Sequence, residues 1–259
     1  MVKVGIIGGS GVYDPNLFED AKKIKVHTPY GKTSSLVTAG KFKGVDMVVI
    51  ARHEEGHRIN PTDVNYRANI WAMKELGVTH IIATGAVGSL KEEIKPGDLV
   101  FTDQFIDRTT KRKSTFYEGN QVCHISIADP TCNKLRDILI KGAKKLGIPH
   151  HENGTCVVIE GPRFSTKAES AMHKIWGADI VGMTMVPECV LAREAGICYA
   201  TVSLVTDYDV WKEQHVSIDG IIRVMGQNLD KFKKLMAEVI PQIDFEECGC
   251  KHAMDTAMV

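Results

Sequence analysis

The sequence has no excess of charge of either sign. Its 32 Lys and Arg residues balance its 32 Asp and Glu residues, so the formal net charge at pH 7 is zero. A chain without a net field has no long-range attraction for nucleic acid or for an anionic lipid surface. We therefore expect neither nucleic acid nor a membrane as a partner, and look to small molecules or another subunit.

Long hydrophobic runs, linkers and repeats are missing as well. No apolar stretch approaches the roughly 18 residues that a membrane span needs. The chain starts with a short β-like run and shows neither the charged nor the apolar region of a signal peptide. With 44% hydrophobic and 25% charged residues over 259 positions, the composition is typical of a globular protein. These features predict a cytoplasmic location.

Cysteine is sparse, and its seven positions are too scattered in too long a chain to form a disulfide scaffold. Most of them suit buried apolar positions. The exception is Cys248-Gly249-Cys250 near the C-terminus. This pair could form a strained local disulfide, provide half of a metal clip together with His252, or remain as two idle thiols. The sequence leaves these three interpretations open.

Short runs rich in β-branched residues alternate with longer amphipathic stretches along the chain. This alternation is typical of βαβ units, in which helices cover a mostly parallel sheet. No linker interrupts it, so we expect a single α/β domain over residues 1–243 and a C-terminal tail over residues 244–259. The expected strands are Val2–Ile7, Met47–Ala51, His80–Thr84, Leu99–Phe105, Thr155–Glu160 and Ile197–Val205.

Two helices are marked by a Pro near the start and a Gly past the end. Asn60-Pro61 is expected to open a helix that ends at Gly77, and Asp129-Pro130 a helix that ends at Gly147. Each pair combines a capping side chain with a Pro whose missing N–H is not needed in the first turn.

A third helix is expected to begin near Ser217 or Asp219. Its apolar residues recur at helical spacing, so this face should lie on the sheet as part of the core. These residues are Ile221, Ile222, Met225, Leu229, Phe232, Leu235, Met236 and Val239.

A polar stretch lies between Gln104 and Ile127. It is too long for an ordinary connection and too rich in charge to be buried. We interpret it as a functional loop or an interface loop.

His53-Glu54-Glu55-Gly56-His57 matches the spacing of a zinc protease, in which two His side chains one helical turn apart bind the metal. That chemistry requires a helix. Here the segment follows the expected strand Met47–Ala51 and contains a glycine, and the next helix is expected only from Asn60-Pro61. We therefore expect no metal at the functional site.

Glycines at positions 8, 9 and 11 follow the first strand and suggest a dinucleotide site, but the spacing is not G-x-G-x-x-G. The next segment, Tyr13-Asp14-Pro15-Asn16, predicts a turn rather than the helix that would hold a pyrophosphate. We exclude NAD on these grounds. What remains is a turn whose backbone N–H groups and Ser10 hydroxyl suit a single phosphate, or serve only a tight turn.

Four strand ends carry polar groups that could converge, because ligands of α/β sheets gather at the carboxyl ends of the strands. Three of them are rich in donors and fit an oxyanion: Gly8–Gly11, Arg52-His53 and Thr84–Gly88. The fourth, Thr206-Asp207-Tyr208-Asp209, is acidic and could accept hydrogen bonds or lend a proton. The alternative for each segment alone is ordinary loop polarity.

Six segments of the chain are specific enough to suggest a known family. They are Gly5-Ile-Ile-Gly-Gly-Ser-Gly11, Ala51-Arg-His53 with His57, Gly88-Ser-Leu-Lys-Glu-Glu-Ile-Lys-Pro-Gly-Asp98, Glu160-Gly-Pro-Arg-Phe-Ser165, Gly182-Met-Thr-Met-Val-Pro-Glu188, and Thr206-Asp-Tyr-Asp209 followed by Trp211-Lys212. Through these segments the sequence from Val4 to Ile243 resembles the purine nucleoside phosphorylase and 5′-methylthioadenosine phosphorylase family, most closely the methylthioadenosine branch. The resemblance implies a mixed, mostly parallel and partly barrel-like sheet flanked by helices.

The resemblance also implies site residues. It places Phe164 against the purine face, Met183 beside the ribose, and Asp207 and Asp209 at the N7 and 6-amino edge. It brings His124 to the 5′ region of the sugar from a neighbouring subunit, which implies a homo-oligomer, either a trimer or a hexamer. The implied phosphate ligands are Ser10, Arg52, His53, Gly85, Ala86 and Thr184.

The chemistry of glycosidic bond cleavage explains why these residue types are needed. Breaking the bond between C1′ and N9 requires a proton source at N7 and an anion beneath the sugar. We expect Asp207 to supply the proton, and inorganic phosphate to be nucleophile and counter-charge at once, with no other cofactor. The expected products from methylthioadenosine are adenine and 5-methylthioribose 1-phosphate, in purine and methionine salvage.

Two positions bear on the base. The resemblance implies Asn at position 207 and Glu at position 165 in members that cleave 6-oxopurine nucleosides, whereas this chain has Asp207 and Ser165. A carboxylate accepts from a 6-amino group but finds no donor in a 6-keto oxygen, so we expect adenine to be favoured and inosine to be a poor substrate.

The sequence leaves alternatives open for the pocket that binds the 5′ end of the substrate and for the class of reaction. Val216 and Ile218 could wall an apolar pocket for the methylthio group, or simply begin the next helix. Compared with the eukaryotic pattern, Ser10 replaces Thr and Gly85 replaces a hydroxyl residue. The competing functions are a broader adenosine or purine nucleoside phosphorylase, a nucleoside-binding protein without catalysis, and a hydrolase that uses water.

Overall fold

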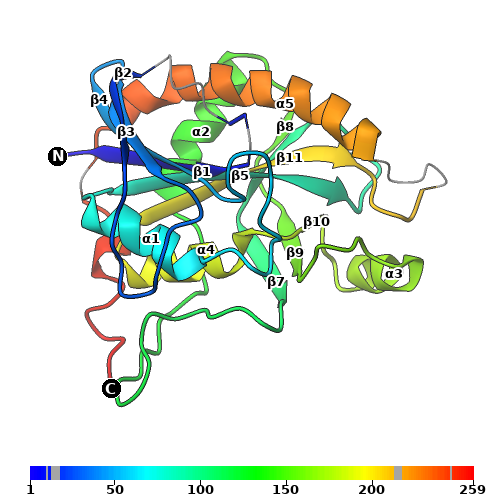
Figure 1. Ribbon diagram of the computed structural model, residues 1–259. Coiled ribbons are helices and arrows are strands. Elements are labelled where there is room, and N and C mark those ends of the chain that lie inside the picture. The colour runs from blue at the N-terminus through cyan, green and yellow to red at the C-terminus, as the bar shows by residue number, and fades with distance from the viewer. Residues whose placement is uncertain (10, 13–17, 213–217, 246) are drawn as a thin grey trace.

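The computed structural model describes residues 1–9, 11–12, 18–212, 218–245 and 247–259. The described strands form one mixed sheet of 11 strands (Figure 1). At its centre, β1 (Lys3–Gly8) lies between two parallel neighbours, β4 (Val45–Ala51) and β5 (His80–Ser89). The three strands predicted from their apolar runs are confirmed here, because strands covered on both faces need apolar residues on both.

The strand β5 has three partners. Besides β1 it pairs in parallel with β11 (Cys198–Asp207) and antiparallel with the short strand β10 (Ile180–Gly182). In turn, β10 runs parallel to β9 (Thr155–Ile159). The carboxyl ends of β1, β4, β5 and β11 therefore meet at one edge, and the strand β10 ends beside the middle of β5.

The expected single strand Leu99–Phe105 is wrong, because the chain breaks at Asp103 into β6 (Leu99–Thr102) and β7 (Gln104–Arg108). The strand β6 pairs with β11, whereas β7 pairs with β9. Since only Asp103 separates β6 from β7, the path through β5, β10, β9, β7, β6 and β11 returns to its start. This closed path gives the sheet its partly barrel-like character.

Four strands have no counterpart in the sequence predictions. Besides β10, the strands β2 (Glu19–Ile24) and β3 (Val37–Phe42) extend the sheet beyond β4 in antiparallel pairing, and β8 (His150–His151) pairs with β6. The outermost strand, β2, carries the sequence EDAKKI and is almost entirely exposed. A charged edge strand discourages pairing with other chains but gives no apolar pattern that could reveal it.

The two helices marked by Pro and Gly are present, but both begin later than expected. Instead of starting at Asn60-Pro61, α1 (Tyr66–Glu75) is capped by Asn65, whose side chain accepts from Ala68 N at 3.1 Å. The helix α2 (Asn133–Lys145) likewise begins after Cys132 rather than at Asp129-Pro130. In both cases Asn or Asp followed by Pro forms a turn before the helix, a role that these residues also favour.

The third helix, α5 (Ile218–Val239), buries Phe232, Leu235 and Val239 completely, as its apolar face predicts. The expectation for Ile222 is wrong: its side chain is 64% exposed. Ile222 stands ten residues before Phe232, so it lies about 80° from Phe232 around the helix axis, at the edge of the buried face.

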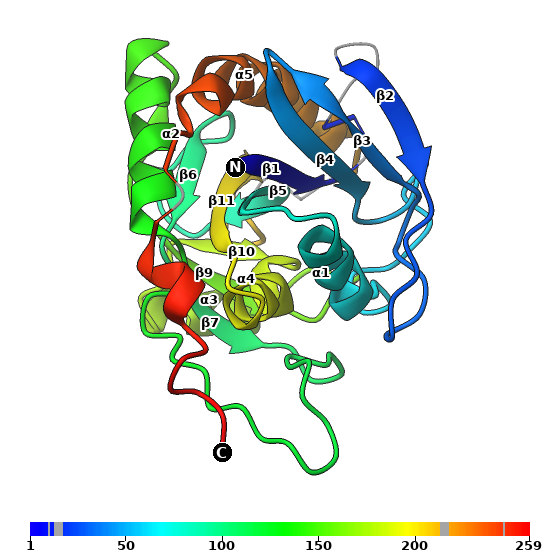
Figure 2. The ribbon, with the colours of Figure 1, turned by 90° about the vertical axis from the view of Figure 1, so that its left-hand side faces the viewer.

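Helices cover both faces of the sheet (Figure 2). The helices α2 and α5 pack on one face over one buried apolar cluster, and α1 and α4 (Met185–Glu194) pack on the other face over a second. The helix α3 (Lys167–Ile175) lies beyond the end of β9, and two short 3-10 helices follow α5, Ile240–Gln242 and Gly249–His252. The predicted α/β unit with a mixed, mostly parallel sheet is confirmed.

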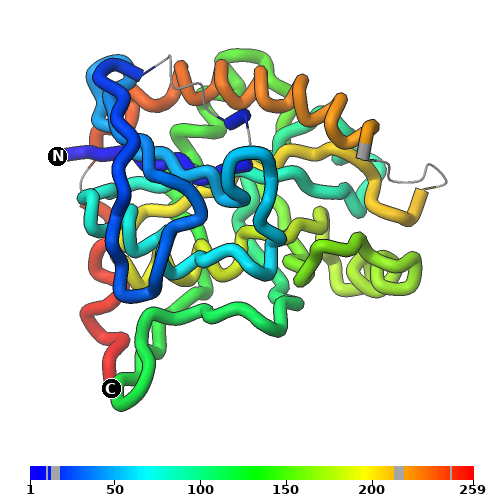
Figure 3. Tube along the Cα trace, viewed as in Figure 1, coloured from blue at the N-terminus to red at the C-terminus, as the bar shows by residue number. Residues whose placement is uncertain are grey.

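The polar stretch after β7 leaves the body of the protein beside the C-terminal segment (Figure 3). The two segments are joined by backbone hydrogen bonds, from His124 N to Ala257 O at 2.7 Å and from Val259 N to Val122 O at 3.1 Å. The expectation that this stretch is too charged to be buried is wrong at Arg112, whose side chain is 1% exposed. Among the described helices, none is long and apolar enough to cross a membrane.

Candidate functional site

The central strand β5 opens in its middle. On one side it pairs with β1 up to Ala83 and with β10 from Gly88 onward, and the described residues leave the positions between without a ladder partner there. Within this gap Gly85 is half-buried and Ala86 is exposed, although both lie in the middle of the sheet. The gap therefore makes backbone groups of the central strand accessible to a ligand.

Arg52 lies at the edge of this gap, directly after β4. Its Nη1 donates to Thr84 O at 2.8 Å, so the Thr84 carbonyl faces the gap. Backbone groups of a strand alternate between its two sides, so the Ala86 N–H faces the gap as well. The expected phosphate ligands Arg52 and Ala86 are thus brought together, one as a guanidinium and the other as a backbone donor.

The Arg52 guanidinium is largely committed to the protein. It is 1% exposed and forms a two-pronged ion pair with the fully buried Glu188, Nη2 donating to Oε2 at 2.9 Å and Nε to Oε1. A further contact, from Nη2 to Ile7 O at 3.4 Å, leaves the second Nη1 hydrogen for a ligand. Burial alone would lower the pKa of Arg52, but the Glu188 carboxylate raises it above its usual range.

Thr184 faces the same gap from the opposite side. It precedes α4, and its side chain makes no capping hydrogen bond. A Cβ placed on Gly85 would lie 3.2 Å from Thr184 Oγ1 and 3.9 Å from Arg52 Nη1. The Gly85 backbone therefore runs between the hydroxyl and the guanidinium, and a side chain there would crowd both. The backbone at Val186 is extended rather than helical, so Thr184 precedes a kink and not the first turn of a regular helix.

His53 is 5% exposed and its ring is held by the backbone. Its Nδ1 lies 2.9 Å from Ile59 O, and since a carbonyl can only accept, Nδ1 carries the proton of the neutral ring. Burial and the neighbouring Arg52 charge lower the pKa of His53 to about 4. At neutral pH the ring is therefore uncharged, and its Nε2 is an acceptor that suits a phosphate hydroxyl.

The acidic pair stands on the far side of the gap, at the end of β11. Asp207 accepts from Thr206 Oγ1 at 2.8 Å and from Asp209 N at 2.8 Å. Burial raises the pKa of the Asp207 carboxyl, although both hydrogen bonds act against the shift. A Cβ on Gly88 would lie 2.9 Å from Asp207 Oδ1, so the close approach of the two strands requires glycine there.

Asp209 is the one member of the pair whose carboxylate is not satisfied by the residues that the structure describes. Its side chain is 5% exposed, and its Oδ2 is buried without a hydrogen-bond partner. Its backbone lies in the left-handed region, with φ of 49°, which is unusual for a residue with a side chain. Strain and an unpaired buried acceptor both cost free energy, and a ligand that donates a hydrogen bond would recover part of that cost.

Phe164 and Met183 belong to the loops that follow two neighbouring strands, β9 and β10. Phe164 is 44% exposed, so much of its apolar ring is accessible. Met183 follows β10, and a Cβ on Gly161 would lie 2.7 Å from its Sδ. The loops after β9 and β10 are thus in contact, as a shared apolar wall requires.

Arg112 and Glu160 fix this wall. Arg112 has no signal of its own in the sequence, and Glu160 appeared only as part of a family motif. Arg112 donates to Met183 O at 2.5 Å, to Val186 O at 2.7 Å and to Glu160 O at 2.7 Å. Its ion pair with the Glu160 carboxylate is 3.1 Å long. Glu188 was missed in the same way: its motif suggested the family, but only the fold shows that it holds Arg52.

The remaining predicted site residues lie elsewhere or outside the described part of the chain. His124 is exposed, and its backbone pairs with Ala257 of the C-terminal segment rather than with any strand that lines the gap. Ser10 and Val216 lie outside the described residues, as does the side chain of Ile218. Of the rest of the predicted set, Gly85, Thr184 and Arg52 lie close together at the gap of β5, and Asp207 and Asp209 lie together at the end of β11.

Hydrogen-bond donors gather at the gap of β5, and the acidic pair stands at the end of β11. Such an arrangement is typical of an α/β enzyme that binds an oxyanion next to a second ligand, one that donates hydrogen bonds. The sequence profile of the Phosphorylase superfamily matches residues 3–241. The chain belongs to this superfamily.

Similar proteins within this superfamily carry one specific name. A protein of Pyrococcus abyssi named S-methyl-5'-thioadenosine phosphorylase is 55% identical over 260 residues, covering 100% of both chains. One of the same name in Xenopus tropicalis is 54% identical over 93% of this chain and 89% of its own. The methylthioadenosine phosphorylase of Schistosoma mansoni in complex with adenine is 42% identical, with a TM-score of 0.94 over 99% of each chain.

Proposed function

We propose that this chain cleaves the N-glycosidic bond of 5′-methylthioadenosine with inorganic phosphate, giving adenine and 5-methylthioribose 1-phosphate. The base assignment rests mainly on the buried Oδ2 of Asp209, which has no hydrogen-bond partner among the described residues and lies beside the partly buried Asp207. The relatives described above support the reaction and the substrate, and a point mutant of the Schistosoma mansoni enzyme has been solved in complex with methylthioadenosine.

The phosphate binds in the gap of β5. The Arg52 Nη1 hydrogen, the Ala86 N–H and the Thr184 hydroxyl donate to its oxygens, while the neutral His53 accepts from its protonated oxygen. The close packing of Gly85 against Thr184 and Arg52 supports this arrangement. The Ser10 hydroxyl is the further donor that we assign to this site from the sequence. Because the Glu188 carboxylate already neutralises the Arg52 charge, the site holds phosphate mainly by hydrogen bonds and less by net positive charge.

The purine binds against Phe164 with its N7 and 6-amino edge toward the acidic pair. The 6-amino group donates to Asp209 Oδ2, which is otherwise buried without a partner. A 6-oxopurine would present an acceptor to this acceptor and leave it unpaired, at a cost of about 1–3 kcal/mol. Adenine is therefore preferred over hypoxanthine, and Met183 lies beneath the ribose.

The reaction follows from these placements. The bond between C1′ and N9 breaks as a phosphate oxygen forms the new bond to C1′, and the electron pair moves into the purine. The carboxyl of Asp207 donates its proton to N7 as that charge develops, which its raised pKa favours. Phosphate fixed in the gap makes the attack effectively unimolecular and stabilises the positive charge on the sugar. Inorganic phosphate is the co-substrate, and the mechanism uses no other cofactor.

The 5′ pocket is completed by a second chain. His124 lies on a loop that leaves the body of its own subunit, so we assign it to the active site of a neighbour in a homo-oligomer, either a trimer or a hexamer. Val216 and Ile218 wall the methylthio group. Residues 1–243 form the catalytic unit, and residues 244–259 form a tail that supports the His124 loop. The enzyme works in the cytoplasm.

A phosphorolysis assay tests this function. Methylthioadenosine, adenosine and inosine are compared at equal enzyme concentration, with and without phosphate, and the free base is measured by chromatography. We expect adenine only with phosphate, methylthioadenosine as the best substrate and inosine nearly inert. Equal cleavage of inosine and adenosine would instead support the broader purine nucleoside phosphorylase, and release of base without phosphate would support a hydrolase.

A further inference from the structure

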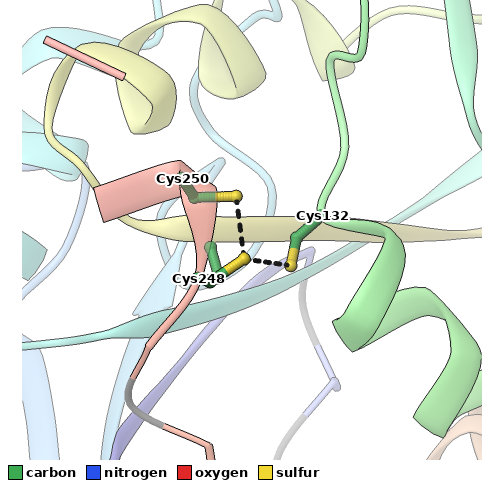
Figure 4. Close-up of side chains that lie close together, drawn as sticks. Cys132, Cys248 and Cys250 are labelled. Carbon is green, nitrogen blue, oxygen red and sulfur yellow. Dashed lines mark hydrogen bonds between the residues drawn. The ribbon is translucent and has the colours of Figure 1, made fainter. Parts of the chain in front are cut away.

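Four cysteines from three distant parts of the chain meet in one cluster outside the active site. Cys132 precedes α2, Cys198 begins β11, and Cys248 and Cys250 belong to the C-terminal tail. Their four Sγ atoms all lie within 4.8 Å of one another. Three of them are drawn in Figure 4, where the sulfur atoms of the tail point toward Cys132.

Two of the sulfur separations match those around a shared tetrahedral metal ion, and the others are within 4.8 Å. Cys132 Sγ lies 3.6 Å from Cys248 Sγ, which lies 3.7 Å from Cys250 Sγ. Zn–S bonds of about 2.3 Å in a tetrahedron place the sulfurs about 3.8 Å apart. A disulfide would hold two sulfurs at about 2.05 Å. In this structure all seven cysteines are free thiols, so the cluster has the spacing of a metal site.

The donor set and its surroundings select the kind of ion. Four thiolates in a closed tetrahedral arrangement are typical of a structural zinc site, since no position is left open for substrate. Cys132 and Cys250 are 2% and 5% exposed within the apolar cluster under α2 and α5, which keeps water away from the ion. Arg193 Nη1 lies 3.6 Å from Cys250 Sγ and partly balances the charge of four thiolates.

His252 does not complete the cluster. It is exposed, and its Nδ1 is 3.1 Å from Asp255 Oδ2. Of the three interpretations of Cys248-Gly249-Cys250, the metal clip therefore needs a change of ligands. The other ligands are Cys132 and Cys198, not His252.

We propose that Cys132, Cys198, Cys248 and Cys250 bind one Zn²⁺ ion that fastens the C-terminal tail to the body of the protein. Each thiol loses its proton to solvent as its sulfur bonds to the metal, so binding releases up to four protons. Beyond the cluster, the tail carries Ala257, whose carbonyl accepts from the His124 N–H. The ion thus holds the segment that supports the His124 loop.

The first test measures metal and thiols in the wild-type chain. The protein is purified with reductant and without chelator, and its zinc is determined by elemental analysis and by native mass spectrometry. We expect about one zinc per chain, lost on denaturation together with the release of four alkylatable thiols beyond those of Cys123, Cys156 and Cys189. A metal-free chain would overturn the proposal, whether its cluster carries free thiols or a mass deficit that shows disulfides, and so would iron in place of zinc.

A matched pair of variants locates the site. Cys250→Ser should lower the bound zinc from about one equivalent per chain to less than about 0.1 equivalent, because three thiolates and a hydroxyl bind zinc far more weakly. Cys123→Ser is the control, since Cys123 contacts Met254 Sδ at 3.7 Å and is not part of the cluster. Zinc retained in Cys250→Ser, or lost equally in Cys123→Ser, would contradict the assignment.

A spectrum of the wild-type chain covers the case in which Cys250→Ser does not fold. Replacement of zinc by Co²⁺ should give the intense thiolate-to-metal absorption of a tetrahedral four-sulfur site, and its absence would overturn the proposal. None of these measurements uses turnover, so failure of the proposed phosphorolysis leaves this inference standing, and the reverse is equally true.

Discussion

The two sides of the proposed site are built in opposite ways. On the side that we assign to phosphate, the Arg52 guanidinium is already paired with Glu188 and with the backbone of β5 and β1. On the side that we assign to the purine, Asp209 keeps a buried oxygen without a partner among the described residues. On the first side the buried polar groups have hydrogen-bond partners within the protein. On the second side, Asp209 gains a partner only when a ligand donates to it.

The difference has a physical reason. Phosphate is common to every turnover and needs a rigid cradle, and a guanidinium clamped by a carboxylate holds its remaining N–H in a fixed direction. The base must be distinguished from other bases, and an unpaired buried acceptor penalises any ligand that cannot donate to it. The rigid Arg52 guanidinium therefore positions phosphate for attack on the sugar, and the unpaired acceptor of Asp209 selects the base.

Removal of the proton source should break the purine side most severely. We expect Asp207→Ala to lower kcat by about 10²–10⁴, the usual contribution of a general acid. The fold should survive, because Asp207 bonds only to its neighbours Thr206 and Asp209 among the described residues. Steady-state kinetics with methylthioadenosine and a thermal melt measure the two effects. Turnover within about tenfold of wild type would refute the role of Asp207.

Removal of the clamp should break the phosphate side. Glu188→Ala leaves the Arg52 charge buried and unpaired, so we expect the free energy of unfolding to fall by about 3–5 kcal/mol, as measured by urea denaturation. Glu188→Gln is the matched control: it keeps an acceptor for Arg52 and should lose less. In the folded protein both variants should raise the KM for phosphate more than the KM for nucleoside. Equal stability of the Ala and Gln variants would show that the pair does not hold the site.

Exchange of an acceptor for a donor should sharpen the contrast. Asp209→Asn presents an amide N–H at the 6 position of the purine, so we expect the ratio of kcat/KM for adenosine to that for inosine to fall by about tenfold or more. The rate with adenosine should fall as well, because its 6-amino group then faces a donor. The assay compares the two nucleosides in parallel, with Asp103→Asn as a control outside the proposed site. An unchanged ratio would remove Asp209 from base recognition.

The smallest expected effect concerns His53 and the pH dependence of stability. Its pKa of about 4 in the folded protein lies below the ordinary 6.5, so the unfolded chain binds more protons between these values. The free energy of unfolding should therefore decrease as the pH falls from about 6.5 to about 4. The slope should approach about 1.4 kcal/mol per pH unit for one such group.

His80 shares this behaviour, because burial lowers its pKa to about 4 as well. We therefore expect His53→Gln to reduce the slope of the wild-type profile without abolishing it, as measured by urea titrations at fixed pH. A profile of His53→Gln that is parallel to the wild type over the whole range would show that His53 is not buried in its neutral form.

The sequence predicts the central strands well, because β1, β4 and β11 are covered on both faces and must be apolar throughout. It predicts the edge strands poorly, because β2 is exposed and follows no apolar pattern. The helix starts at Asn60-Pro61 and Asp129-Pro130 fail for a related reason: the same residues suit a helix start and a turn, and only packing decides.

The site divides in the same manner. Arg52 and the acidic pair could be predicted because each stands at the end of a recognisable strand. Glu188 and Arg112 could not, because their roles arise from contacts between segments far apart in sequence. The meeting of Cys132 and Cys198 with the tail is a third case, since no spacing in the chain links these positions.

The measurement that tests the central claim most directly is a crystal structure of the chain with adenine and phosphate. We expect the 6-amino group within hydrogen-bond distance of Asp209 Oδ2, N7 facing the Asp207 carboxyl, and the phosphate on Arg52, Ala86 and Thr184. Adenine bound elsewhere, or bound with Asp209 Oδ2 still unpaired, would contradict the account of how this cleft selects its base.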